Sequence, residues 1–328
     1  MQLNNISDEK ITIIMPVCNG DSTLSEAFFS LENLKHKSLV DKIIIIDDGS
    51  KDNSLKLISQ FKSINSGYEV LIIKHPKSVG LAGSYNEGIE RTSTSLFVVM
   101  HQDVVLPDRE SIKKIMKPFH ESDDVVATFP TTLHPSDVWG TYNFWQKVLF
   151  APLVDRKTDG FINKFDCIRK IEGVKYNNLI YRTAGEDFDY EMNLLGYGRV
   201  IHADDLEVIH IHNKNPKFSI YDLCKKKSQL AEDAGVNIRR HFCKIKLDFL
   251  ALVFLRPFLL AGLVIWPHKI NLIFVSMLIL YSVLFTRTVY RLEYRNCRVL
   301  LLPAINIIIV FLYSYYLLKG IILGKQVL

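Results

Sequence analysis

The sequence predicts an α/β protein with a doubly wound, mostly parallel sheet, followed by transmembrane helices at its carboxyl end. Short apolar runs rich in β-branched residues alternate with segments of helical pattern from Ile11 to His212. Acidic or polar residues directly follow several of these runs. The composition then changes near His241, since charges are spread throughout before it, whereas Leu, Ile, Val, Phe and Tyr dominate from Leu247 onward.

Four apolar runs near the amino terminus are expected to form buried strands, because they are too short for ordinary helices and turn residues or acids bound them. They are Ile11–Met15, Ile43–Ile46, Val70–Ile73 and Leu96–Met100. Helices are expected between them, with Ser22 or Thr23 capping the first and Asp52 or Asn53 capping the second. The segment Gly80–Gly88 leads into the third. This alternation indicates parallel strands, so their carboxyl ends meet at one edge.

The next part of the chain is less regular. One more strand is expected at Asp124–Phe129, and the aromatic-rich region Thr131–Tyr181 forms either the wall of an acceptor site or ordinary core. A short helix is expected from Ala184 to about Gly196. Val208–His212 alternates apolar residues with imidazoles, so both histidines point to the same face of a strand.

Polar residues at these strand and helix ends are candidate site residues. His101-Gln102-Asp103 follows a buried strand, the place where open α/β sheets bind ligands. Asp103 either holds a divalent metal that binds phosphate groups of a ligand or belongs to a merely polar strand end. The acids at Glu186–Asp189 either serve the site or stabilise the positive end of their helix. His210 and His212 contact metal or phosphate, or are structural.

Charge and cysteine content restrict the class of protein. The net charge of +5 is modest, and no basic stripe with interleaved aromatics appears, so nucleic acid is not an expected partner. The five cysteines are scattered without a C-x-x-C spacing, which predicts a reducing compartment. The start, MQLNNISDEK, lacks the basic and apolar parts of a signal peptide, so the soluble part is expected on the cytoplasmic side of a membrane.

Three apolar segments are candidate transmembrane helices, since crossing the bilayer takes about 20 apolar residues. Leu247–Trp266 carries Arg256 in its middle, and it either crosses the bilayer, kinks or lies in the interface. Ile270–Thr286 is near the lower length limit for crossing, and Val299–Leu318 is long and apolar enough to cross. The arginine-rich loop Arg287–Arg298 is expected in the cytoplasm. The predicted domains are a soluble domain at 1–216, a basic amphipathic juxtamembrane linker at 217–246, and a membrane domain with two to three transmembrane helices at 247–328. The linker is either a solvated helix or a basic collar on anionic lipid headgroups.

Six segments occur in the order seen in family-2 nucleotide-sugar glycosyltransferases, and the chain resembles that family over roughly Lys10–His212. They are Ile11–Asn19, Ile43–Ser54, Ser78–Gly88, the strand ending in Asp103, Gly185–Asp187 and Val208–His210. The resemblance implies the GT-A fold, a Rossmann-like doubly wound sheet, for the domain at 1–216. It also implies transfer that inverts the anomeric configuration of the sugar.

The resemblance assigns roles to residues. Asp103 is the metal-ligating acid of the family's D-x-D motif, and His210 completes the metal or diphosphate site. Asp187 is the general base, with Glu186 beside it. Pro16 and Cys18 line the nucleobase, Asp47 or Asp48 bonds the base or ribose, and Gly80 and Asn86 let the backbone approach the nucleotide. The full nucleotide-sugar set comprises Pro16, Cys18, Asn19, Asp47, Asp48, Gly80, Asn86 and Gln102.

The sequence departs from the family pattern at several positions. His101 stands where the first acid of D-x-D is expected, Cys18 where an aromatic residue is common, and Tyr85 where an arginine is frequent. No Gln-x-x-Arg-Trp motif follows, which argues against a processive cellulose- or chitin-type synthase.

These assignments predict a membrane-anchored, metal-dependent enzyme that uses Mg²⁺ or Mn²⁺ and a nucleotide diphosphate sugar, a UDP-sugar by default. A phosphate acceptor is already ionised, so the presence of Asp187 favours a sugar hydroxyl on a glycan, expected to be lipid-linked, in cell-surface glycan or glycoprotein glycan assembly. The alternatives are transfer to a polyprenyl phosphate and a non-catalytic, membrane-anchored binding protein of the same fold. Membrane lipids are the other expected partner.

Overall fold

The computed structural model describes residues 9–64, 67–181, 184–265 and 268–327. The amino-terminal stretch that carries no signal-peptide pattern (residues 1–8) and Trp266, at the end of the first apolar segment, lie outside these ranges. The chain divides into two compact units. Unit 1 comprises Met1–Val138, Asp155–Asn178 and Glu186–Lys214, and unit 2 comprises Trp139–Val154, Leu179–Gly185 and Asn215–Leu328.

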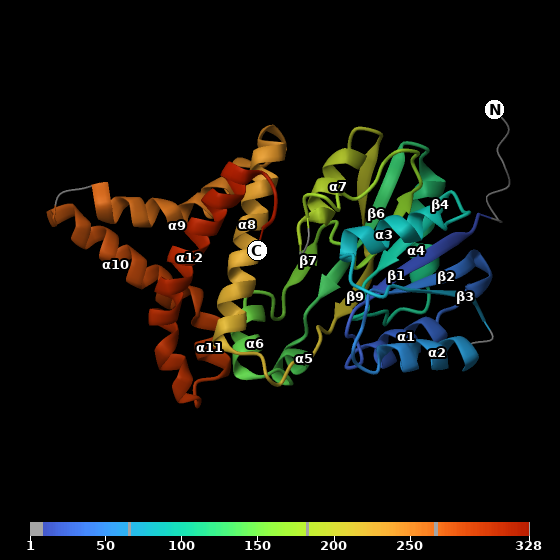
Figure 1. Cartoon of the computed structure of the whole chain (residues 1–328), viewed down its shortest axis with the longest axis horizontal. Helices are drawn as coiled ribbons and strands as arrows, with labels where there is room; N and C mark the ends of the chain where they lie inside the picture. The colour runs from blue at the N-terminus through green and yellow to red at the C-terminus, as the bar shows by residue number, and fades with distance from the viewer. Residues whose placement is uncertain (1–8, 65–66, 182–183, 266–267, 328) are drawn as a thin grey trace. The chain divides into compact units, whose positions relative to one another are not determined.

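Unit 1 contains a mixed sheet in which, within the described ranges, nine strands run in the order β3-β2-β1-β4-β8-β6-β9-β5, with β7 paired to β6 (Figure 1). The strands are β1 Ile11–Val17, β2 Val40–Asp47, β3 Glu69–Lys74, β4 Leu96–Met100, β5 Val104–Val105, β6 Val125–Leu133, β7 Lys157–Asp159, β8 Phe165–Arg169 and β9 Arg199–His210. β1 pairs in parallel with β2 and β4, and β2 with β3. The strand β8 runs antiparallel to both β4 and β6, and β6 is parallel to β9.

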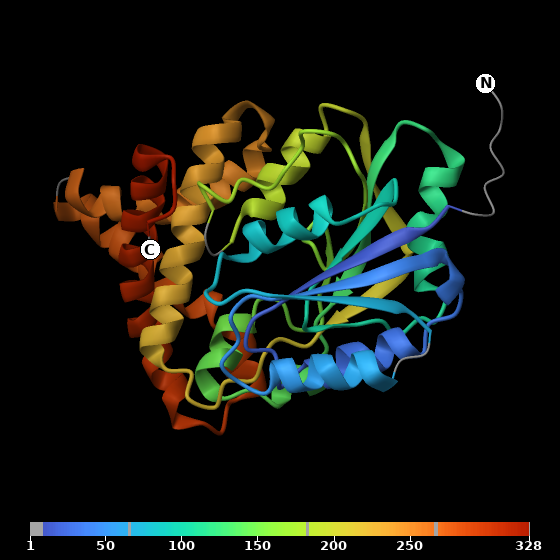
Figure 2. The same ribbon diagram turned by 45° about the vertical axis from the view of Figure 1, so that its right-hand side comes forward.

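Helices cover both faces of this sheet, as its buried parallel half requires. They are α1 Leu24–Glu32, α2 Ser54–Ile64, α3 Leu81–Glu90, α4 Ser111–Glu121 and α7 Glu186–Leu194. Side chains alternate along β1, so Ile13 packs in the core shared with α1, α2 and α4, whereas Ile14 packs in the core shared with α3 and α7. Figure 2 shows α1 and α2 on one face and α3 on the other. The predicted α/β class is confirmed.

The structure adds strands in the region that the sequence left irregular. The predicted strand at Asp124–Phe129 continues as β6 to Leu133, and β7 and β8 lie within Thr131–Tyr181. Pro130 hides the extension in the sequence, because proline lacks the N–H that a strand interior needs. A register shift between Pro130 and Thr131 accommodates it in the pairing with β9.

Unit 2 is helical, and the predicted linker at 217–246 is mostly its first long helix. Its helices are α6 Phe144–Phe150, α8 Ile220–His241, α9 Leu247–Ile265, α10 His268–Phe285, α11 Arg287–Leu292 and α12 Leu302–Leu323; the short α5, Ser136–Gly140, begins in unit 1. A capping box of Ser219 and Asp222 starts α8. A Cβ on Gly235 would lie 2.2 Å from the main-chain oxygen of Leu317. The helices α8 and α12 therefore pack at a distance that only glycine allows, and α8 belongs to the helical unit.

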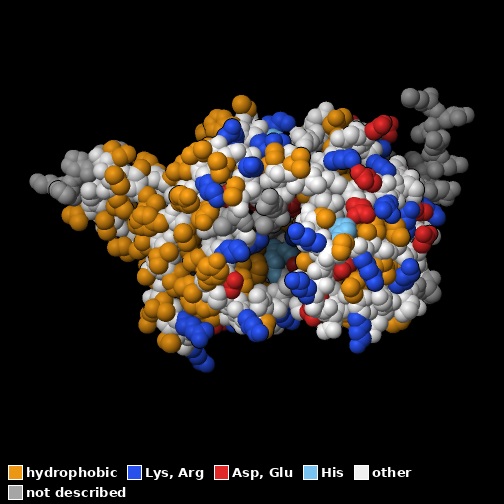
Figure 3. All heavy atoms as spheres, in the orientation of Figure 1, with side chains coloured by type: hydrophobic (Ala, Val, Ile, Leu, Met, Phe, Trp, Pro, Cys, Tyr) orange, Lys and Arg blue, Asp and Glu red, His pale blue; other side chains and the backbone are white. Residues whose placement is uncertain are grey.

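The surface of unit 2 is apolar along its carboxyl-terminal helices. Within the described residues, the helical segments Leu247–Ile265 and Cys297–Leu323 are long and apolar enough to cross a membrane, and the apolar helix Ile270–Phe285 is shorter. Figure 3 shows hydrophobic side chains over α9, α10 and α12. Those with more than half of their surface exposed include Leu252, Phe258, Leu272, Ile273, Ile308, Phe311 and Tyr315. An apolar surface of this extent is typical of contact with a membrane or a partner protein.

Candidate active site

A pocket of about 170 Å³ lies in unit 1 at the edge where β1, β2 and β4 end. It is lined by Pro16, Val17, Cys18, Asp48, Leu81, Ser84, His101, Gln102 and Asp103. These residues come from distant parts of the chain and meet because the three strands are parallel. The pocket therefore collects five sequence-predicted site residues at the edge where open α/β sheets bind ligands.

The side chain of Gln102 fixes the strand end of β1. Its Oε1 accepts a hydrogen bond from the backbone N–H of Cys18 at 2.8 Å, and its Nε2 donates to the Cys18 carbonyl at 3.2 Å. Asn19 follows with φ 50°, and its Oδ1 accepts from the N–H of Lys51 at 2.9 Å. Gln102 thus ties the end of β4 to the turn after β1. Asn19 ties the same turn to the loop after β2, and it supports the pocket without lining it.

Asp48 organises the loop that enters α3. Its carboxylate accepts hydrogen bonds from Ser78 Oγ at 2.6 Å, Val79 N at 2.8 Å and Gly80 N at 3.0 Å. Burial opposes the charge of Asp48, but these bonds and one from His75 hold its pKa below the usual value. Gly80 has φ 84°, a conformation that glycine adopts without steric cost. The carboxylate therefore shapes the mouth of the pocket through this loop.

Four predicted nucleotide-binding residues do not line the pocket, namely Asn19 and Gly80, described above, and Asp47 and Asn86. The buried Asp47 accepts a hydrogen bond from the N–H of Ser50 at 3.3 Å. The amide of Asn86 donates to the carbonyl of Tyr176 at 2.9 Å and accepts from the Tyr176 N–H at 2.8 Å. Both side chains therefore have structural contacts, and their nucleotide role stays a prediction.

Asp103 and His210 meet at one side of the pocket. The Asp103 Oδ2 atom lies 3.1 Å from His210 Nε2. The strand pairing Val104↔His210 and a hydrogen bond from Ile211 N to the Asp103 carbonyl at 2.9 Å bring them together. The Asp103 Oδ1 atom is buried and accepts no hydrogen bond from any residue that the structure describes. Since a bare buried carboxylate oxygen is costly, these residues fit a bound cation.

His101 occupies the position of the missing acid and is held by a lysine. The buried Lys164 Nζ donates to His101 Nδ1 at 2.7 Å, so the ring proton of the neutral imidazole is on Nε2. Burial, and then the charge of Lys164, keep the pKa of His101 well below its ordinary value. The Nδ1 atom lies 3.8 Å from Asp103 Oδ1. The site thus carries a neutral imidazole and an ammonium at the position where a D-x-D motif would have its first carboxylate.

Two further imidazoles stand beside His210. His134 follows β6, and its ring stacks on that of His212 with centroids 5.4 Å apart, while the His210 and His212 centroids are 3.7 Å apart. Burial lowers the pKa of His134 to about 4 and holds those of His210 and His212 well below the ordinary value. These imidazoles are therefore neutral at pH 7, the form that binds metals.

The predicted base lies in the first turn of α7. Burial raises the pKa of Asp187, while the charge of Lys164 opposes this shift. Its Oδ1 accepts from the N–H of Phe188 at 2.8 Å, and Glu186 beside it is buried. Lys164 interacts electrostatically with both Asp103 and Asp187. The predicted metal ligand and the predicted base thus share one buried ammonium.

The structure shows two residues in this region that sequence reasoning missed, Lys164 and His134. Lys164 precedes the short strand β8, which the sequence does not reveal. His134 follows the extension of β6 beyond Pro130, and the two β-branched threonines after Pro130 were the signal that could have found it.

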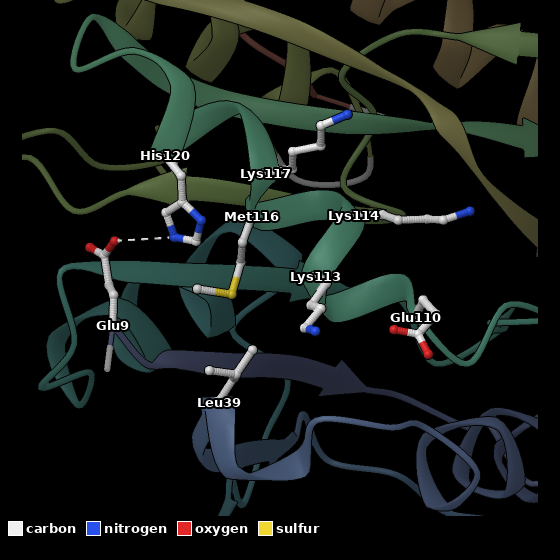
Figure 4. A pocket seen from close by; sticks show the side chains of 8 residues that line it. All are labelled: Glu9, Leu39, Glu110, Lys113, Lys114, Met116, Lys117 and His120. Carbon is white, nitrogen blue, oxygen red and sulfur yellow. Dashed lines mark ion pairs between the residues drawn. The ribbon is translucent and has the colours of Figure 1, made fainter. Parts of the chain in front are cut away.

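A larger pocket of about 660 Å³ opens at another part of unit 1 (Figure 4). It is lined by Glu9, Leu39, Glu110, Lys113, Lys114, Met116, Lys117 and His120. Glu9 and Leu39 precede β1 and β2, so this pocket lies at the amino ends of these strands. It contains none of the predicted site residues, and size alone does not make it the active site.

Comparison with known proteins gives a consistent set of relatives. Residues 12–173 match the model of the family described as glycosyl transferase family 2. A dolichol-phosphate mannosyltransferase of Pyrococcus furiosus is 28% identical over 116 residues, which cover 35% of this chain and 32% of that protein. An O-antigen chain rhamnosyltransferase of Salmonella typhimurium is 29% identical over 228 residues, which cover 63% and 68%. An undecaprenyl-phosphate 4-deoxy-4-formamido-L-arabinose transferase of Proteus mirabilis is 25% identical over 120 residues, 36% of either chain.

A solved structure shares the fold. The mannosyltransferase of Pyrobaculum calidifontis, in complex with GDP-Man and Mn²⁺, superposes with a TM-score of 0.61 over 94% of this chain and 88% of that one, at 13% identity. At this identity the likeness concerns the fold. The sequence matches to the Pyrococcus and Proteus proteins span about a third of the length of each.

Proposed function

This chain carries a family 2 glycosyl transferase domain of GT-A fold, and we propose that it transfers a sugar from a nucleotide diphosphate sugar to a hydroxyl group of a glycan acceptor. The observation that carries the proposal is the meeting of Asp103 and His210, 3.1 Å apart, beside the pocket where β1, β2 and β4 end. Ligand pockets usually measure about 300–1,000 Å³. The smaller pocket here accepts part of the nucleotide, lined by Pro16, Cys18 and Gln102, and the diphosphate extends toward Asp103.

A divalent cation, Mg²⁺ or Mn²⁺, fits the site because Asp103 Oδ1 is bare and His210 is neutral. When bound, it supplies positive charge that offsets the charge developing on the leaving diphosphate. Asp103 and His210 are the residues that hold it. Lys164 provides a second, fixed positive charge near the same place, and its hydrogen bond orients His101.

Asp187 is the proposed general base. A sugar hydroxyl becomes a good nucleophile when its proton is removed, and a base works best when its pKa lies near the working pH. Burial raises the pKa of Asp187 toward that range, and its place in the first turn of α7 keeps it beside Glu186. Direct displacement by the deprotonated hydroxyl inverts the anomeric configuration.

The acceptor is proposed to be lipid-linked and the protein to be membrane-bound, with unit 1 on the cytoplasmic side. Two apolar helical segments of sufficient length support the anchor, and the arginines of Arg287–Arg298 support this orientation. The Salmonella relative is named an O-antigen chain rhamnosyltransferase, which supports a glycan as the acceptor.

A second candidate is transfer to a polyprenyl phosphate. The names of the Pyrococcus and Proteus relatives favour it, since they specify dolichol phosphate and undecaprenyl phosphate. An ionised phosphate needs no general base, so the two candidates differ in their dependence on Asp187.

The test is to offer the full chain, purified in detergent, a panel of UDP-, GDP- and dTDP-sugars with either a lipid-linked glycan or a polyprenyl phosphate, with and without chelator. We expect one donor to be consumed, with sugar appearing on the lipid-linked glycan only when divalent metal is present. Asp103→Asn should abolish transfer, while Asp108→Asn, at a carboxylate paired with Lys114 2.6 Å away, should not. Transfer only to polyprenyl phosphate would establish the second candidate, and consumption of no donor would contradict both.

A further inference from the structure

Three imidazoles, those of His134, His210 and His212, gather beside Asp103 and are called the histidine cluster below. Each offers one ring nitrogen, and these nitrogens lie within 4.8 Å of one another. His210 also belongs to a second group with His101 and Asp103 that meets the same limit. The two groups share His210, which lies beside Asp103 in one group and beside His134 and His212 in the other.

The strand register produces this arrangement. The strands β6 and β9 run in parallel, and Leu133 lies opposite Ile209. The residues that follow these two, His134 and His210, therefore reach the same edge of the sheet. His212 lies two residues beyond, with φ 42°, a left-handed conformation that is uncommon for residues other than glycine. Such conformations persist where the surroundings determine them, and they concentrate at functional sites.

The cluster has the mark of a site rather than of ordinary core. The Nδ1 atom of His134 is buried and has no hydrogen bond with any residue in the described ranges, and the same is true of Asp103 Oδ1. Buried polar atoms are normally paired, because an unpaired one costs about 1–3 kcal/mol. The residues of both atoms lie beside His210, and a bare imidazole nitrogen and a bare carboxylate oxygen are both ligands that a cation satisfies.

The ligand types indicate the kind of cation. Imidazole nitrogens suit Zn²⁺, Co²⁺ and neighbouring transition metals, whereas Mg²⁺ prefers an octahedron of oxygens. Three imidazoles make up the protein ligands of some zinc sites, and Asp103, 3.1 Å from His210, is the carboxylate next to them that can supply a fourth ligand. With Zn–N bonds of about 2.0–2.1 Å, two tetrahedral ligands stand roughly 3.3 Å apart, so binding draws the nitrogens together by at most about 1.5 Å.

We propose that the histidine cluster and Asp103 together bind a divalent transition metal of the Co²⁺ and Zn²⁺ kind and discriminate against Mg²⁺. His134 and His212 thereby become metal ligands in addition to the two residues assigned above. The inference rests on the proposed function in that Asp103 and His210 serve the same site. It narrows the choice of metal for that site.

The test is a metal titration of the full chain, purified in detergent and stripped with chelator. Co²⁺ bound by several imidazoles gives visible absorption bands, so Co²⁺ binding is followed without any sugar transfer. We expect one Co²⁺ per chain, bands that a large excess of Mg²⁺ does not remove, and displacement by Zn²⁺. His134→Ala and His212→Ala should each weaken Co²⁺ binding by at least about 10-fold. Loss of a residue that only hydrogen-bonds a metal ligand already costs about 10-fold in metal affinity, and loss of a ligand should cost more.

The matched control is His120→Ala. His120 lies near the end of α4 at the pocket of Figure 4, outside the cluster, and its removal should leave Co²⁺ binding unchanged. Thermal unfolding in chelator checks that each variant is folded. If a cluster variant does not fold, the wild-type titration alone decides.

Absence of Co²⁺ bands in the wild-type protein, displacement of Co²⁺ by equimolar Mg²⁺, or unchanged binding in both cluster variants would overturn this inference. The proposed function is judged separately. Sugar transfer supported by Mg²⁺ in a protein without Co²⁺ bands would leave the function standing and end the inference. Tight Co²⁺ binding by a protein that consumes no nucleotide sugar would support the metal inference and contradict the proposed function.

Discussion

Replacement of Asp187 by asparagine tests the choice of acceptor most sharply. The amide has nearly the same size as the carboxylate but cannot accept a proton from a sugar hydroxyl. General-base catalysis contributes about 10²–10⁴-fold, and each factor of ten corresponds to about 1.36 kcal/mol, so the barrier should rise by about 2.7–5.4 kcal/mol. Since Asp187 does not line the nucleotide pocket, the loss should fall on kcat and leave the KM for the donor unchanged.

The assay is the initial rate of nucleoside diphosphate release across a range of pH. The wild-type rate should fall as pH decreases through the pKa of Asp187, because the protonated carboxyl cannot act as a base. Burial raises this pKa, so the fall should occur above pH 4, the ordinary range of aspartate. Asp187→Asn should be slow and should lack this pH dependence.

Glu191→Gln is the matched control. Glu191 lies one turn further along α7, and burial with the charge of Asp187 raises its pKa to about 7. This variant should keep most of the activity, which shows that the loss in Asp187→Asn is not a general disturbance of the helix. Undiminished turnover by Asp187→Asn would refute the general-base role and favour a phosphate acceptor.

Two further variants test other parts of the structure. Lys164→Met should shift the acid limb of the pH–rate profile to higher pH, because the ammonium of Lys164 opposes the rise that burial causes in the pKa of Asp187. An acid limb at the wild-type pH would contradict this electrostatic interaction between Lys164 and Asp187. Gly235→Leu should lower the melting temperature, since its Cβ would lie 2.2 Å from the Leu317 oxygen and overpacking costs about 1–3 kcal/mol. Gly140→Ala, where no atom lies within 4 Å of the added Cβ, should leave it unchanged, and equal melting temperatures would argue against the close packing of α8 and α12.

Much of the fold follows from local patterns in the sequence. β1, β2 and β4 are short apolar runs closed by turn residues or acids, and their parallel pairing places Cys18, Asp48 and Asp103 at one edge. The antiparallel β8 escapes such reasoning, because its five residues include the buried Asp166 and arginine at its end. A strand this short has too little hydrophobic pattern to distinguish it from a loop.

Part of the site is also predictable, because local motifs identify some of its residues. Asp103 and His210 follow from motif order, but their contact depends on the pairing of β5 with β9, which no local pattern specifies. Lys164 contacts His101 across 63 residues of sequence, and His134 reaches the site only because β6 continues past Pro130. Contacts of this kind are set by strand register in the folded sheet.

The central claim is that the strand ends in unit 1 form one metal-dependent nucleotide site, and calorimetry with UDP and GDP tests it most directly. The wild-type chain should bind one of these nucleotides in the presence of Mn²⁺ and lose that binding in chelator. Asp103→Asn should not bind it with or without metal. Equal binding in chelator, or undiminished binding by Asp103→Asn, would contradict the account.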